Sequence, residues 1–217
     1  MIPGFLYALY KLIKASGNVI ITDVIKYRYF HEGDPMARKE VINIKDIRTA
    51  AFNMTREQGV TEVTARKLAA YGGFSTQPIF RNYKNMEECL NDVYEDTLQF
   101  FDKFYEDYPK GSRIPFVNLG MCYIAFATKE PNLFKFLFMT KNTHDMNLYT
   151  MLNGRTGAVK LEMAKAKEEG AKQPEQIFMK MWMLIHGAAC MTITGDYDLT
   201  EVQTRLQLED AYKAFVR

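Results

Sequence analysis

The chain has 217 residues, of which 47% are hydrophobic, enough for one large or two small domains with a buried core. Its 3 cysteines and 3 histidines are scattered, without a CxxC pair, which argues against a disulfide framework or a zinc site and fits a reducing cytoplasm. No apolar run approaches the roughly 20 residues of a membrane span. No motif for a nucleophile, a phosphate-binding loop or a metal is present, so we expect neither enzymatic activity nor a cofactor.

Charge is unevenly distributed along the chain. The net charge is +2, but residues 45–85 carry seven basic and three acidic side chains, whereas residues 86–217 carry 15 basic and 19 acidic ones. A basic segment on an acidic remainder predicts a polyanion as the partner of the basic part. Ordinary charge scatter is the alternative.

Residues 1–35 differ in composition from the rest, being rich in the Ile, Lys, Tyr, Asn and Phe that AT-rich DNA encodes. They lack the basic start and cleavage site of a signal peptide. The codons of Glu32-Gly33-Asp34 can contain a ribosome-binding sequence just before Met36. We hypothesise that synthesis starts at Met36 and that 1–35 is a translated leader or disordered arm; a genuine arm that packs on the body or contacts DNA is the alternative.

From Ile44 onward the apolar residues recur with a helical period, and no alternating strand pattern of useful length occurs. The predicted fold class is therefore all-α. The first helix should end at Gly59. A short second helix should begin at Thr61 or Thr64 and end at the glycines 72–73, and a third should span about 76–83. The later helices are expected at about 86–108, capped by Asn85, and at 115–129, 131–140, 155–169, 174–194 and 199–216, the last capped by Asp198 or Thr200.

The three short helices, with a tight glycine turn between the second and third, have the layout of a helix-turn-helix unit. The polar residues 75–77 at the tip of the third helix offer hydroxyl and amide groups to base edges or phosphate. We expect Ile79 and Tyr83 to turn inward, and Arg81 and Lys84 to reach phosphates. A generic helical hairpin with a solvated polar cap is the alternative.

Residues 47–90 resemble the DNA-binding domain of the TetR (TetR/AcrR) family of bacterial transcription regulators. The similarity lies in Glu57-Gln58-Gly59, in Val63 to Ala69, in Gly73-Phe74-Ser75 and in Ile79 to Tyr83. The run Ser-Thr-Gln-Pro-Ile-Phe-Arg is similar to a variant common in low-GC Gram-positive members.

The resemblance implies an N-terminal helix-turn-helix domain at 44–90 and a C-terminal regulatory domain at 91–217. It implies a cytoplasmic homodimeric regulator, a repressor that a small molecule releases from a palindromic double-stranded operator. The residues it assigns to DNA contact are Thr64, Ser75, Thr76, Gln77, Phe80, Arg81 and Lys84. Family members usually carry Tyr at position 80 and Lys at position 86, so two backbone contacts are in question. A helical small-molecule-binding or adaptor protein that has lost specific DNA reading is the alternative.

The C-terminal part also resembles the family's regulatory domain, through Trp182, His186 and Gly187. The resemblance places the dimer interface in the last two helices. Large aromatic and adaptable residues suit a largely apolar effector pocket, with plain core packing as the alternative. The predicted pocket residues are Phe101, Tyr105, Phe116, Cys122, Tyr123, Phe126, Phe138, Phe178, Trp182 and His186. We expect His186 to bond a backbone carbonyl and Gly187 to allow a close approach of two helices.

Overall fold

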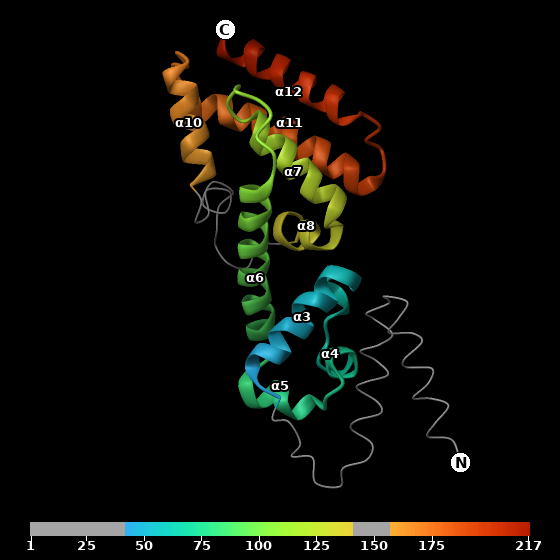
Figure 1. The fold of residues 1–217 in the computed structure, drawn as a ribbon. Coiled ribbons are helices and arrows are strands. Elements are labelled where there is room, and N and C mark those ends of the chain that lie inside the picture. Colours follow the sequence, from blue (N-terminus) through green and yellow to red (C-terminus); the bar gives the residue numbers. More distant parts are fainter. Residues whose placement is uncertain (1–41, 141–156) are drawn as a thin grey trace, which may run out of the picture. The chain divides into compact units, whose positions relative to one another are not determined.

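The computed structural model describes residues 42–140 and 157–217, and these form only helices and their connections (Figure 1). The all-α prediction is confirmed. The hypothesised leader at 1–35, the start at Met36 and the loop expected at 141–154 lie outside the described residues. The elements are α3 (Ile44–Gln58), the 3-10 turn η1 (Val60–Glu62), α4 (Ala65–Gly72), α5 (Thr76–Asn82), α6 (Met86–Asp107), α7 (Val117–Lys129), α8 (Pro131–Phe138), α10 (Ala158–Glu168), α11 (Pro174–Thr194) and α12 (Glu201–Val216).

The helix starts follow from side-chain caps in the sequence. The side chain of Thr64 caps α4, and that of Asn85 caps α6 by accepting the N–H of Glu88 at 2.9 Å. Thr200 caps α12 in a reciprocal arrangement with Gln203, so Thr200 rather than Asp198 starts the last helix. A polar side chain at the N-cap position accepts hydrogen bonds from N–H groups that the first helical turn leaves unpaired.

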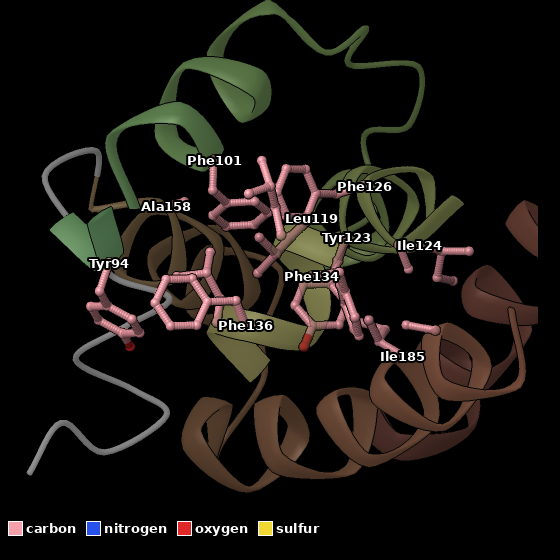
Figure 2. Close-up of a cluster of buried hydrophobic side chains, with 14 of the residues drawn as sticks. Tyr94, Phe101, Leu119, Tyr123, Ile124, Phe126, Phe134, Phe136, Ala158 and Ile185 are labelled. Atoms are coloured by element: carbon pink, nitrogen blue, oxygen red, sulfur yellow. The ribbon is translucent and has the colours of Figure 1, made fainter. Parts of the chain in front are cut away.

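We call α3 to α5 the head and α7 to α12 the body; α6 runs from one to the other without a break. Because α6 spans the predicted boundary at 90/91, the two-domain division remains a prediction. The centre of the body is α7, which is buried on nearly every side and packs against α6, α8, α11 and α12. Figure 2 shows the hydrophobic core to which α6, α7, α8 and α11 contribute side chains.

Close helix approach occurs at Gly120, not at Gly187. A Cβ on Gly120 would lie 2.8 Å from side-chain carbons of Ile185 and 2.9 Å from Leu208 Cδ1, so a side chain there would separate α7 from α11 and α12. Gly187 is exposed, and nothing in the chain lies within 4 Å of the Cβ it lacks. The expectation for Gly187 is therefore wrong within a single chain.

The last two helices both carry exposed apolar residues. By length and composition α11 is apolar enough to cross a membrane, although none was expected; Glu175 and Lys180 are its only Asp, Glu, Lys or Arg residues. A core helix of a globular protein passes the same test, and α11 buries one face in the body. On α12 the buried residues are Thr204, Leu208 and Tyr212, whereas Val202 and Leu206 are 68% and 52% exposed.

Candidate DNA interface and effector site

The turn between α4 and α5 depends on two adjacent glycines. Gly73 has φ +71°, the left-handed region that glycine enters without strain, and its N–H closes α4 onto the carbonyl of Ala69 or Ala70. A Cβ on Gly72 would lie 2.1 Å from the ring of Phe74, so only glycine lets that ring fold back over the helix end. The turn therefore fixes where α5 begins.

The third helix divides its residues between an inner and an outer side. Ile79 and Tyr83 are buried among the other head helices, as predicted. Phe80 is 54% exposed, and Arg81 and Asn82 beside it are exposed as well. An aromatic side chain exposed on a helix of seven residues gains nothing for the fold. It is available to a partner.

Tyr83 anchors the far end of α5 to α6. Its hydroxyl donates to Asp92 Oδ2 at 2.9 Å, and Arg48 of α3 lies 3.5 Å from the same carboxylate and donates to Asp96 Oδ2 at 3.0 Å. Burial, and then the bond to Asp92, raises the pKa of Tyr83 well above its usual value, so the phenol stays a donor. This network joins α3, α5 and α6 at one point.

The residues predicted to face DNA lie at the two helix starts and along the outer side of α5. Thr64 is exposed, but its hydroxyl is used as the cap of α4, where it accepts the N–H of Lys67 at 3.4 Å. Ser75 precedes α5 and makes no side-chain cap bond. Thr76 is half-buried, whereas Gln77, Phe80, Arg81 and Lys84 are exposed. All except Thr64 therefore come from one helix and its flanks.

The predicted pocket residues come together, but as a packed core. Tyr123 contacts the rings of Phe101, Phe138 and Trp182 at centroid distances of 6.2, 4.6 and 4.7 Å (Figure 2 shows Phe101 and Tyr123). The remaining members of the predicted set extend or flank this contact network: Tyr105, Phe116, Cys122, Phe126, Phe178 and His186. Burial raises the pKa of the Cys122 thiol to about 12, so this cysteine is protonated.

His186 bonds side chains rather than a backbone carbonyl. Its Nδ1 lies 3.0 Å from the Tyr123 hydroxyl and its Nε2 lies 3.5 Å from Cys190 Sγ. The imidazole is stacked on the ring of Trp182. Burial lowers its pKa, so the neutral form is favoured. The expected carbonyl partner is thus replaced by a phenol, because Tyr123 reaches the ring from α7.

The described residues form three grooves, and none of the residues predicted to form the pocket lines them. One groove of about 480 Å³ lies against α6 and α7, and an adjoining one of about 350 Å³ lies between α7, α11 and α12. A third, of about 630 Å³, lies between α3 and α6. In the sequence, the aromatic residues Phe100, Phe104 and Tyr108, spaced four apart along α6 and its C-cap, are the pattern that could have indicated the first groove.

Comparison with known proteins agrees with this architecture. Residues 116–214 match the family model of the tetracyclin repressor-like C-terminal domain. A putative TetR-family transcriptional regulator from Vibrio parahaemolyticus is similar in structure, with a TM-score of 0.57, 17% identity, and coverage of 78% of this chain and 96% of that one. A putative TetR-family transcriptional regulator from Rhodococcus sp. has a TM-score of 0.51 and 13% identity, covering 80% of this chain and 98% of that one. No curated protein matches the chain.

A three-helix head with a glycine turn, joined by one long helix to a helical body, defines the class of helix-turn-helix transcriptional regulators. Within that class, the C-terminal domain and the shared fold point to one family. Residues 116–214 match the tetracyclin repressor-like C-terminal domain, and the chain shares the fold of two proteins described as TetR-family transcriptional regulators.

Proposed function

We propose that the protein is a cytoplasmic, homodimeric repressor that reads a short palindromic operator. The observation that carries this is the division of α5, which buries Ile79 and Tyr83 and exposes Gln77, Phe80 and Arg81. A helix this short derives its stability from its neighbours, so its exposed side is free to enter the major groove.

The exposed residues have complementary roles in this proposal. Ser75 and Gln77 bond base edges or phosphate, and the ring of Phe80 makes apolar contact with a thymine methyl or a sugar. Arg81 and Lys84 pair with phosphates, and neither has a carboxylate partner among the described residues.

The dimer forms through α11 and α12. Both helices expose large apolar side chains to solvent, and on α11 these flank the exposed Gly187. The exposed apolar residues of this face are Met183, Leu184, Met191, Leu199, Val202 and Leu206. Because such a patch is unfavourable in water, a second copy that covers it stabilises the protein. In that arrangement Gly187 gives the close approach that the single chain does not use.

Release from DNA follows from effector binding to the body. In the proposed dimer, the two heads must be spaced to match the two halves of the operator. An effector that binds more tightly to a conformation with a different spacing shifts the population away from the DNA-bound form. It can act on the head through α6, which begins next to α5 and ends in the body.

A DNA-binding assay tests the proposal. The protein should bind the region upstream of its own gene in preference to random duplex, with an affinity that falls steeply as salt rises. Arg81→Ala should weaken binding at least tenfold and reduce the salt slope by about 1. Arg113→Ala, in the exposed connection before α7, is the matched control and should leave the affinity unchanged. Binding without preference over random duplex would favour a helical adaptor instead.

Dimerisation has its own test. Met183→Glu places a charge on the 64% exposed centre of the α11 face and should convert the dimer into a monomer in light scattering. Leu161→Glu introduces the same charge at an exposed apolar position of α10 and should leave the dimer intact. A Met183→Glu protein that remains dimeric would exclude this interface.

A further inference from the structure

Two adjoining grooves of the body share one set of residues. The groove of about 480 Å³ and that of about 350 Å³ are both lined by Tyr108, Ala125, Lys129 and Glu201. A site of this size holds a small organic molecule. It lies outside the predicted pocket, since none of the ten residues predicted there lines either groove.

The walls of the shared groove are flat and largely apolar. Phe104 of α6 and Tyr108, which follows the last residue of that helix, are stacked, with ring centroids 6.3 Å apart and planes inclined by 28°. The opposite wall includes Ala125 of α7, whose small side chain leaves the space open. Ring faces next to an open, apolar gap suit the flat body of another aromatic molecule.

The charged residues that line the two grooves are paired, with one exception. Lys103 bonds Asp107 at 2.8 Å, and Arg205 bonds Glu201 at 3.2 Å. Lys129 has no carboxylate partner in residues 42–140 and 157–217, and its Nζ lies 5.8 Å from the ring centroid of Phe104. Among the lining residues, Lys129 is therefore the one cation without an ion-pair partner, and it lies where both grooves meet.

A second donor lies beside it. Tyr108 makes no side-chain hydrogen bond with the described residues, and burial, followed by the charge of Glu201, raises the pKa of its phenol. The phenol therefore remains protonated and can donate. An ammonium and a phenol hydroxyl next to an aromatic wall match an acid group attached to a flat apolar body.

We propose that this groove, here called the Lys129 groove, binds a small organic anion with an aromatic body, such as an aromatic carboxylate or sulfonate. The acid group pairs with Lys129 and Tyr108, and the ring packs on Phe104 against Ala125. Binding itself requires no DNA. That the anion is the effector rests on the proposed function, because the ligand would then act on DNA binding through the end of α6.

Two fluorescent probes test the site in the full-length protein without DNA. The probe 1-anilinonaphthalene-8-sulfonate carries the anion, and N-phenyl-1-naphthylamine is its uncharged analogue. Lys129→Ala should weaken the sulfonate at least tenfold and change the amine less than twofold. Lys135→Ala, an exposed lysine on α8 outside the grooves, is the matched control and should affect neither probe.

Filling the groove tests the location of the site independently of the charge of Lys129. Ala125→Trp fills the shared space and should abolish tight binding of both probes. Thr128→Trp, at an exposed position of α7 that lines the smaller groove alone, fills that groove with little risk to the fold and should weaken both probes. Unchanged sulfonate affinity in Lys129→Ala overturns the anion assignment, and unchanged affinity of both probes in the tryptophan variants overturns the site. Sulfonate binding that leaves operator affinity unaltered retains the site and removes only its role as effector site.

Discussion

Arg56, in the last turn of α3, and Glu130, between α7 and α8, form a two-point ion pair that joins the head to the body. The Nε of Arg56 donates to Glu130 Oε2 at 2.7 Å, and its Nη2 contacts Oε1. Asn132 adds a bond from Nδ2 to the carbonyl of Arg56 at 2.9 Å. The two charges differ in exposure, since the side chain of Glu130 is 10% exposed and that of Arg56 is 45% exposed.

This difference predicts unequal effects of removing the two partners. Arg56→Met leaves a nearly buried carboxylate without a partner and should lower the free energy of unfolding by about 1–3 kcal/mol. Glu130→Gln leaves an arginine that can turn to water, so its loss should be less than half as large. Urea unfolding at neutral pH measures both. Lys103→Met, which breaks an exposed pair, should stay within about 0.5 kcal/mol; equal losses for Arg56→Met and Glu130→Gln would contradict the asymmetry.

The helices and their starts were predictable because local chemistry determines them. Asn85 and Thr200 cap their helices through bonds three residues along the chain, and the glycines at 72–73 end α4 by backbone geometry. Such interactions involve neighbours in sequence, so the sequence pattern is sufficient to predict them.

The bonding partners and the grooves were not predictable, because they depend on which helices meet. His186 could not be paired with Tyr123 without knowing that α7 lies against α11. Gly120 looked like any glycine within an apolar helix, and only packing shows that it lies against Ile185. Likewise, Lys129 stands out only once the partners of the surrounding charges are known.

Gly120 should be intolerant of a side chain. Gly120→Ala gains about 1 kcal/mol of helix propensity, but its Cβ would collide with the buried side chains of Ile185 and Leu208. We expect the steric collision to outweigh the gain in helix propensity. Gly120→Ala should therefore lower the free energy of unfolding by about 1 kcal/mol, and Gly120→Val should lower it by more. Chemical denaturation of the three proteins measures the order. A stabilised Gly120→Ala protein would show that the two neighbours move away at little energetic expense.

Because phenylalanine has no hydroxyl group to bond a phosphate, Phe80 should keep the affinity for DNA lower than a tyrosine at this position would. Phe80→Tyr adds a hydroxyl at a position that is 54% exposed, so the fold is unaffected and the new group can bond a phosphate. One such bond contributes about 1 kcal/mol, which corresponds to an operator affinity roughly fivefold higher. Fluorescence anisotropy with a labelled operator measures the change. The salt slope should stay constant, because tyrosine adds no charge; weaker binding by Phe80→Tyr would exclude a phosphate at this position.

His186 should make stability depend on pH below neutrality. Burial lowers its pKa in the folded protein relative to the value of about 6.5 in the unfolded chain, so the unfolded chain binds the proton more readily. The contribution of His186 to stability is thus fully present above pH 6.5 and decreases as the pH falls from there toward the folded-state pKa. His186→Asn keeps a polar group near Tyr123 but does not titrate in this range. Unfolding free energies measured from pH 7.5 to 5 should therefore fall more steeply for the native protein than for His186→Asn, and parallel curves would show that the imidazole is protonated equally well in both states.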